Sequence, residues 1–297
     1  MISAAAKQRF EALAASGDGD PAIFARAAKQ GDMQAAADLG ALFACAGFVE
    51  PALMLDTYDA AARGWFGEPS PPMTLRGGAG SVSPDLWAPF WAFLEDESKM
   101  DAGTFTMRTA GLGSFVDAGF ARRAGEASLA YPGVPDAVSQ GWPEKFRLSD
   151  LAACPGNSLG GEFHRLIVDN KFDLEVLDRD ALGLSKLRPP LDYLNARALQ
   201  CHDLWHIVGG YHTTALHEVA ISAFQLSQFG HNYSAQFLAV ITAKSAFKRP
   251  EGVGLLLEII LTGWRHGRQT PSLLGVDWPA VWSAPTETVR QRLAVAA

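Results

Sequence analysis

From Cys154 onward the chain is a succession of helix-length segments with apolar residues three and four positions apart, separated by glycine and proline. The first segment takes Asn157 or Ser158 as its N-cap and ends near Asn170. Segments with the alternating pattern of a β-strand are almost absent. We therefore expect an all-α fold, a multi-helix orthogonal bundle. The further helices that the pattern predicts cover residues 190–208, 213–229, 234–247, 252–264 and 286–294.

The N-terminal part differs in composition. Its first 65 residues are alanine-rich and predict short helices, among them 21–29 and 33–45. Residues 66–85, FGEPSPPMTLRGGAGSVSPD, concentrate proline and glycine as linkers do. We therefore expect a helical N-terminal extension over 1–80, with its linker from about 66, and a second all-α domain over 81–297. Within the start of that domain the sequence predicts helices at 86–94 and 115–127, and a turn at 131–135.

Composition limits the classes of protein to consider. With 48% hydrophobic residues among 297, the chain can bury a sizeable core, and its net charge of −7 gives no basic footprint for nucleic acid. Its three cysteines lie far apart, which favours reduced thiols in a cytoplasmic compartment. We expect no signal peptide. Residues 219–243 lack charged side chains but carry Gln, Asn, His and Ser, so we expect buried helices there, with no transmembrane helix and peripheral contact with a membrane left open.

The sequence HDLWH, residues 202–206, is a candidate metal-binding motif. On a helix, His202 and His206 lie about 40° apart and Asp203 about 60° beyond His206, so all three share one face. Imidazoles and a carboxylate are ligands that suit zinc, and also iron, cobalt or manganese. The competing interpretation is a set of solvated or internally satisfied polar residues on an ordinary helix.

Glu218 joins this motif only if the chain reverses direction. On one straight helix it would lie roughly 18 Å from His206, far beyond metal-bonding distance. Gly209 and Gly210 accept the backbone angles that end a helix and permit a tight helix-to-helix turn. We therefore predict a helical hairpin that brings Glu218 back to the imidazoles of 202 and 206.

Other polar residues near the motif are weaker candidates. The helix with Glu218 bears a polar stripe that either lines a site or faces water. Histidines 212, 217 and 231 are either partners of the metal ligands or partly exposed polar side chains. The candidate substrate contacts are Ser222, Gln225 and His217.

The combination of HDLWH and Glu218 with the segments NSLGGEF, AFQLSQ, GWRHGR and LLGVDW resembles the coenzyme Q (ubiquinone) biosynthesis protein four family. The resemblance is clear from about 154 to 295, fainter over 86–150 and absent from the first 80 residues. It implies an all-α protein that binds a divalent metal, usually described as zinc, through His202, Asp203, His206 and Glu218. The chain departs from the family pattern at His217, where the family has a glycine before the metal glutamate.

The resemblance also implies a function. Its members are associated with oxidative decarboxylation, the replacement of the ring carboxylate of a polyprenyl hydroxybenzoate precursor by a hydroxyl. Asp203 and Glu218 are then the candidate catalytic residues, since either carboxylate can leave the metal to move a proton. The implied partners are the prenylated quinone precursor or another isoprenoid lipid, the surface of the inner membrane and other ubiquinone biosynthesis proteins; a homo-oligomer stays open.

Two alternatives remain at this level. One is a non-catalytic component that binds prenyl lipid and organises the ubiquinone biosynthetic complex around a closed, structural metal. The other is a metal phosphohydrolase of HD type, with ligands from His164, His202, Asp203 and Asp277. That ligand set would leave His206 and Glu218 without a role.

Overall fold

The computed structural model describes residues 1–71, 80–81 and 83–296. The regular secondary structure among these residues is helical, with no strand, which confirms the all-α prediction. The N-terminal helices are α1 (Ala4–Ser16), α2 (Pro21–Lys29), α3 (Met33–Ala44), which continues as a π-helix over Cys45–Val49, and α4 (Met54–Phe66). The middle of the chain forms α5 (Trp87–Glu95), α6 (Ala102–Leu112), α7 (Phe120–Ser128), α8 (Val134–Ser139) and α9 (Leu148–Ala152). The C-terminal part forms α10 (Leu159–Asn170), α11 (Leu191–Gly209), α12 (Ala215–Phe229), α13 (Asn232–Lys248), α14 (Pro250–Gln269) and α15 (Thr286–Arg292).

Most predicted helices are present, and their ends differ by a few residues. The Ser158 hydroxyl caps α10 by accepting a hydrogen bond from the Gly161 amide, as the sequence predicted. Helix α14 is longer than predicted at both ends; at its start, Pro250 is well accommodated in the first helical turn. The helix predicted from 115 begins at Phe120, since Val116 is extended and the Asp117 carboxylate accepts the Gly119 amide in a local turn. Much of the predicted linker, residues 72–79 and 82, lies outside the described residues.

The N-terminal helices share one core with the C-terminal helices. Helix α3 packs on α13, and α4 packs on both α2 and α14. The ring of Tyr58, on α4, stacks on Phe43 of α3 with centroids 4.1 Å apart and on Trp264 of α14 at 5.0 Å. The Trp264 indole N–H donates to Asp59 Oδ1 at 2.8 Å. The predicted extension therefore buries α14 of the second predicted domain.

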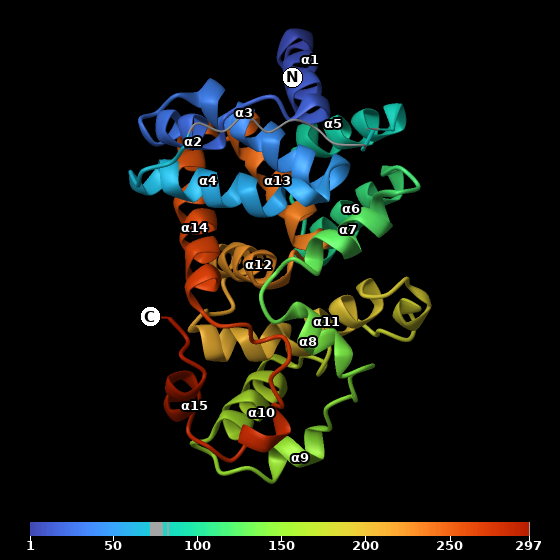
Figure 1. Cartoon of the computed structure of the whole chain (residues 1–297), viewed down its shortest axis with the longest axis vertical. Coiled ribbons are helices and arrows are strands. Elements are labelled where there is room, and N and C mark those ends of the chain that lie inside the picture. The colour runs from blue at the N-terminus through green and yellow to red at the C-terminus, as the bar shows by residue number, and fades with distance from the viewer. Residues whose placement is uncertain (72–79, 82, 297) are drawn as a thin grey trace.

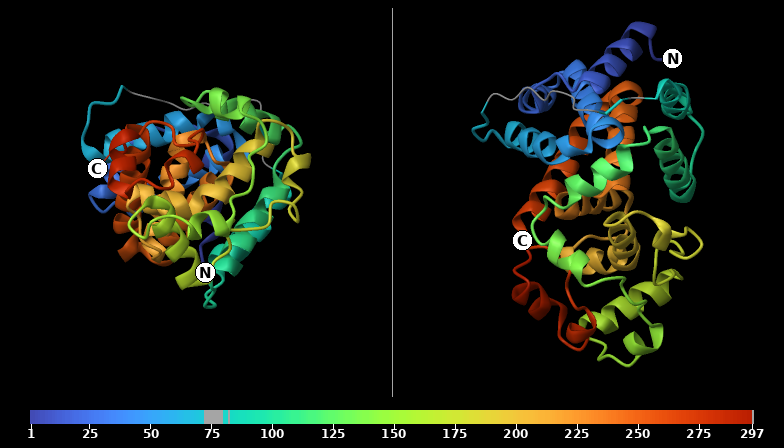
Figure 2. Two further views of the ribbon diagram at one scale, coloured as in Figure 1. Left: turned by 90° about the horizontal axis from the view of Figure 1, so that it is seen from below. Right: turned by 45° about the vertical axis from the view of Figure 1, so that its right-hand side comes forward.

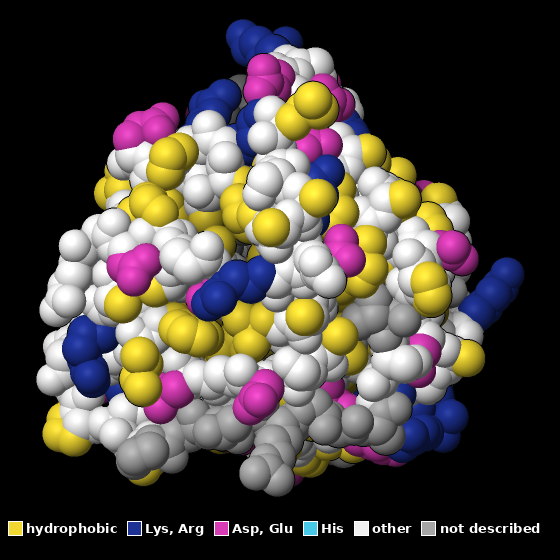
Figure 3. Space-filling view, turned by 90° about the horizontal axis from the view of Figure 1, so that it is seen from above, with side chains coloured by type: hydrophobic (Ala, Val, Ile, Leu, Met, Phe, Trp, Pro, Cys, Tyr) yellow, Lys and Arg dark blue, Asp and Glu magenta, His cyan; other side chains and the backbone are white. Residues whose placement is uncertain are grey.

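The molecule is elongated, and its helices cross at large angles (Figure 1). Helices α1–α5 lie at one end, α9, α10 and α15 at the other, and α12 lies between them beside α14 (Figures 1 and 2). Figure 3 shows the N-terminal end, where Lys and Arg side chains and Asp and Glu side chains are interspersed among apolar ones. Among the described residues, no helix is both long enough and apolar enough to span a bilayer.

A buried arginine fixes the helix that carries HDLWH. Arg197, on α11, is 7% exposed, and its Nε donates to the carbonyl of Leu274 at 2.9 Å. One terminal nitrogen donates to the carbonyl of Val276, and the other donates to Gln200 at 2.7 Å. Charge-assisted hydrogen bonds of this kind are stronger than neutral ones. The LLGVDW segment therefore holds α11 in place, five residues before the first histidine of the motif.

Candidate metal centre

The double glycine ends α11 and reverses the chain, as predicted. Gly210 adopts the left-handed conformation at φ 75°, and its amide donates to the Ile207 carbonyl at 3.2 Å. The next amide, of Tyr211, donates to the carbonyl of His206 at 2.8 Å. These bonds are those of a helix C-cap, for which a glycine in this conformation is the usual residue. The chain then enters α12 only five residues later.

Two side chains tie the start of α12 to the turn. The Thr214 hydroxyl is the N-cap and accepts the amide of His217 at 3.4 Å. His217 Nδ1 in turn accepts the amide of His212 at 2.5 Å, and the two imidazoles stack with centroids 5.2 Å apart. Both contacts fix the first turn of the helix, which contains Glu218.

The hairpin brings the predicted ligands together. The Nε2 atoms of His202 and His206 are 3.3 Å apart. Glu218 spans them, with Oε2 at 3.2 Å from the nitrogen of His202 and Oε1 at 3.4 Å from that of His206. The ligand atoms of His202, Asp203 and His206 all lie within 4.8 Å of one another. Glu218 of α12 thus contacts both imidazoles, and Asp203 of α11 has a ligand atom within 4.8 Å of each.

The exposure of these residues gives the site a buried side and an open side. His206 is 1% exposed, whereas the Glu218 side chain is 42% exposed and that of His202 is 19% exposed. Access from solvent is therefore on the side of α12. An open side is what a metal site requires in order to bind a further ligand.

The electrostatics of the cluster favour paired charges. Burial opposes ionisation of Glu218, but hydrogen bonds from His202 and His206 outweigh it and lower the glutamate pKa to about 2. Burial also opposes the charging of His202, and the contact with Glu218 outweighs it and raises the imidazole pKa. For Asp203 burial dominates and raises the carboxyl pKa. The two carboxylates are therefore not equivalent: one is strongly anionic and the other is nearer to accepting a proton.

The predicted substrate contacts lie along α12. Ser222 is 9% exposed and Gln225 is 3% exposed, and the amide nitrogen of Gln225 lies 3.0 Å from His202 Nδ1. The polar stripe therefore faces α11 at Gln225. His217 packs at the turn, with its ring 6.0 Å from that of Tyr211.

Neither His164 nor Asp277 joins the cluster. Across the described residues, the group of His, Cys, Asp and Glu ligand atoms within 4.8 Å of one another contains His202, Asp203 and His206 only. His164 lies on α10 and Asp277 lies in the loop after α14. The ligand set of an HD phosphohydrolase is thus not assembled in this structure.

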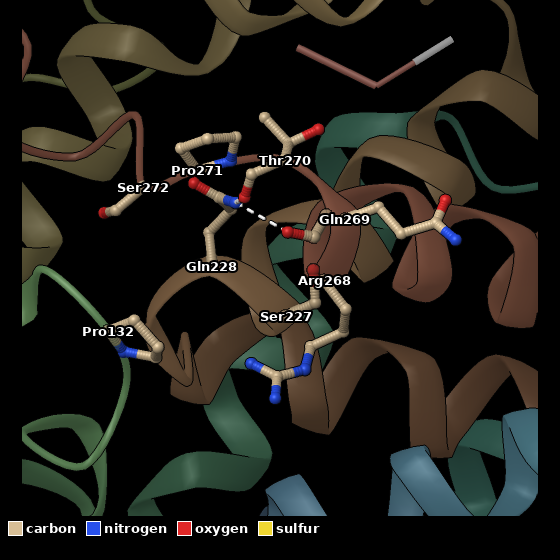
Figure 4. A pocket seen from close by; sticks show the side chains of 9 residues that line it. Pro132, Ser227, Gln228, Arg268, Gln269, Thr270, Pro271 and Ser272 are labelled. Atoms are coloured by element: carbon tan, nitrogen blue, oxygen red, sulfur yellow. Dashed lines mark hydrogen bonds between the residues drawn. The ribbon is translucent and has the colours of Figure 1, made fainter. Parts of the chain in front are cut away.

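A cavity of about 290 Å³ lies at the far end of α12, away from these ligands (Figure 4). Ser227, Gln228 and the C-terminal end of α14 line it. The Gln228 amide donates to the carbonyls of Gly267 and Thr270 at 2.7 and 2.9 Å, and its oxygen accepts the Leu273 amide at 2.8 Å. Its polar groups are engaged in holding the end of α14.

One contact of the hairpin was not predicted from the sequence. The Tyr211 hydroxyl lies 2.6 Å from His266 Nδ1, and His266 Nε2 lies 3.0 Å from the carbonyl of Ala296. Because a carbonyl only accepts, the second contact places a proton on Nε2, and the tyrosine donates to the first nitrogen. The GWRHGR segment thus links the hairpin turn to the C-terminal residues. No local spacing indicates a contact across 55 residues.

The donor set fits a divalent metal ion. Two imidazoles and one or two carboxylates are a common ligand set for zinc and for iron, cobalt or manganese. The Nδ1 of His202 has a partner in Gln225, as metal-binding histidines usually do. His206 Nδ1 is buried and has no hydrogen-bond partner among the described residues.

Comparison with known proteins identifies curated relatives that match about half of the chain. The mitochondrial ubiquinone biosynthesis protein COQ4 homologue of Rattus norvegicus is 25% identical over 154 residues, 50% of this chain and 54% of that protein. The homologue of Danio rerio is 24% identical over 152 residues, 49% of this chain and 52% of that protein. The chain thus spans about half the length of the curated relatives that it matches.

A solved structure and a family pattern complete the comparison. The crystal structure of a candidate ubiquinone biosynthesis protein from Nostoc punctiforme covers 73% of this chain and all of its own, with a TM-score of 0.54 and 23% identity, which shows a shared fold. The pattern of the family described as coenzyme Q (ubiquinone) biosynthesis protein Coq4 matches residues 143–297. This match covers more than half of the chain and runs through α11 and α12, and the chain therefore belongs to the coenzyme Q (ubiquinone) biosynthesis protein Coq4 family.

Proposed function

We propose that His202, Asp203, His206 and Glu218 bind a divalent metal ion and that this site acts in ubiquinone biosynthesis. The observation that carries the proposal is the convergence of donors from two helices: both Nε2 atoms lie within 3.4 Å of the Glu218 carboxylate. Zinc is our first candidate, with iron, cobalt and manganese as alternatives. The pathway follows from the family to which the chain belongs.

The reaction we propose is oxidative decarboxylation of a prenylated hydroxybenzoate. The bond between the ring and its carboxylate breaks, carbon dioxide leaves, and the electron pair stays on the ring. Dioxygen then takes up these two electrons and two protons and leaves as hydrogen peroxide, and water supplies the hydroxyl oxygen. A divalent cation held by these ligands would supply Lewis-acid stabilisation of negative charge.

The residues of the chain have separate tasks in this scheme. His202 and His206 would hold the cation, with His206 on the buried side of the site. Asp203, whose burial raises its pKa, is the carboxylate that we assign to proton transfer. Glu218 lies on the open side, where it limits access and orients the bound substrate.

We further propose that the substrate is a lipid. The isoprenoid tail would bind against apolar side chains, and burial of apolar surface would supply affinity of roughly 25 cal/mol per Å². The membrane surface and other ubiquinone biosynthesis proteins are the partners that we propose, on the ground of family membership.

Metal content tests the site. We expect purified protein to contain a stoichiometric divalent metal by elemental analysis, and the variants His202→Ala and Glu218→Ala to lose it. His212→Ala is the matched control, because His212 lies on the same hairpin, is exposed and is not in the cluster. An unchanged metal content in both ligand variants would contradict the proposed site.

Turnover tests the reaction. We expect metal-loaded protein, given a prenylated hydroxybenzoate and dioxygen, to release carbon dioxide and form the hydroxylated ring, and the variant Asp203→Asn to do so much more slowly. Full metal loading and lipid binding without turnover would instead assign the chain to the organising role in a biosynthetic complex.

A further inference from the structure

We propose that Gln225 is a positioning residue that fixes the ring of His202 so that Nε2 faces the metal. The side-chain amide of Gln225 lies 3.0 Å from His202 Nδ1 and is 3% exposed. On the opposite side of the same ring, Nε2 lies 3.2 Å from Glu218 Oε2. Both nitrogens of His202 therefore contact a side chain of α12, and Nε2 also lies 3.3 Å from His206 Nε2 on its own helix.

The spacing on α12 explains how one helix provides both contacts. Gln225 follows Glu218 by seven residues, which is close to two helical turns. The two side chains therefore lie on the same face of α12, two turns apart, with Ser222 between them. This face packs against α11. The His202 ring is held at both ends by a rigid element rather than by a loop.

The chemistry of a metal-bound imidazole explains why the partner is an amide. A neutral imidazole carries one proton, so a metal on Nε2 requires the proton on Nδ1, which must then donate to an acceptor. A glutamine offers an oxygen and an NH₂ group, and a half-turn of the amide exchanges them. In the structure the NH₂ group faces Nδ1; the half-turned amide places the oxygen there and accepts the Nδ1 proton.

His206 provides a contrast. Its Nδ1 has no hydrogen-bond partner among the described residues, and its ring is held by packing at 1% exposure. His202 is more exposed, so packing alone constrains it less. A hydrogen bond that selects the orientation of the ring therefore matters most at His202.

This inference rests on the metal site proposed above, and its test is the affinity for Zn²⁺, measured by competition with a chromophoric chelator. Gln225→Leu keeps the approximate size of the side chain and removes the acceptor, so we expect Zn²⁺ affinity to fall by about 10- to 100-fold. Gln225→Glu keeps an acceptor at the same position, and we expect its affinity to equal or exceed that of the unaltered protein.

Gln228→Leu is the matched control. Gln228 lies three residues further along α12, is 6% exposed, and donates to the carbonyls of Gly267 and Thr270 (Figure 4). Its replacement disturbs a buried glutamine without touching His202. We expect this variant to lose stability and to keep its Zn²⁺ affinity.

A spectroscopic readout separates positioning from general loss of structure. In ¹⁵N NMR of the Zn²⁺-loaded protein, we expect His202 to carry its proton on Nδ1, and this signal to exchange faster with solvent in Gln225→Leu. Unaltered Zn²⁺ affinity in Gln225→Leu would overturn the inference, as would a tenfold loss in Gln225→Glu. If the unaltered protein itself binds no Zn²⁺, the proposed metal site fails instead, so the two failures are distinguishable.

Discussion

The carboxylate of Glu218 lies 3.2 Å from the imidazole of His202, although 16 residues separate them in the chain. The relationship depends on the turn between α11 and α12, because a continuous helix would carry the two groups far apart. Gly210 occupies the left-handed region at φ 75°, which costs other residues free energy. The geometry of the candidate metal centre thus depends on a backbone conformation outside it.

The first prediction concerns Gly210. We expect Gly210→Ala to lower the free energy of unfolding by about 1–2 kcal/mol, because alanine is strained in the left-handed region. We expect Gly210→Asn to cost less, since asparagine adopts this conformation more readily. Urea unfolding measures both. Equal stabilities for the two variants would mean that the left-handed conformation of the turn does not limit the fold.

The ligand arrangement was predictable because its parts follow short-range rules. Histidines four residues apart on a helix share a face, and a glycine pair permits reversal, so the positions of His202, His206 and Glu218 follow from spacing alone. The all-α fold was predictable for the same reason. Periodicity and capping residues act over a few positions, and Ser158 and Thr214 cap their helices by local hydrogen bonds.

Contacts between distant segments were not predictable in this way. The N-terminal helices pack on α13 and α14 through contacts such as Tyr58 with Trp264, and the sequence did not indicate these partners. Composition distinguishes residues 1–65 from the remainder, but it carries no information on which helix covers which. The contacts of Gln225 with His202 and of Tyr211 with His266 depend on the same tertiary packing.

The second prediction concerns His217, where the resemblance to the family leads one to expect glycine. His217 Nδ1 accepts the amide of His212 and so closes the turn before Glu218. We expect His217→Gly to remove this bond and lower the stability by roughly 1–2 kcal/mol, the sum of a lost hydrogen bond and a glycine in a helix. His217→Asn keeps an acceptor near the turn and should cost less. Hydrogen exchange of the His212 amide checks the prediction, and an unchanged rate in His217→Gly would contradict it.

The third prediction is a pH dependence. Burial lowers the pKa of His231 from 6.5 to about 3, and the nearby His202 adds to this effect. The unfolded chain therefore takes up a proton that the folded protein does not. This contribution to stability is fully present above pH 6.5 and is lost as the pH falls from 6.5 toward 3.

The variant His231→Phe tests this pH dependence, because it keeps a ring beside Phe229 and Tyr233 and cannot take up the proton. In urea unfolding at a series of pH values, we expect the variant to lose stability less steeply over this range, by up to about 1.4 kcal/mol per pH unit. Parallel curves for the two proteins would contradict the assignment.

The fourth prediction concerns the contact that seats α12 on α14. A Cβ atom at Gly263 would lie 2.5 Å from the carbonyl oxygen and 3.1 Å from the Cα of Ala220, so alanine there must push the two backbones apart. We expect Gly263→Ala to lower the free energy of unfolding by about 1–3 kcal/mol, as overpacking does in other cores.

Gly254 provides the control. It lies on the same helix with open space around it, so Gly254→Ala should instead raise stability by roughly 0.5–1 kcal/mol, because alanine has the better helix propensity. Because α12 carries Glu218, the displacement in Gly263→Ala should also weaken Zn²⁺ binding, whereas Gly254→Ala should leave it unchanged. Changes of opposite sign in the free energy of unfolding, with weaker Zn²⁺ binding in Gly263→Ala alone, would show that close packing of α12 on α14 supports the site. A loss of stability in both variants would contradict this explanation.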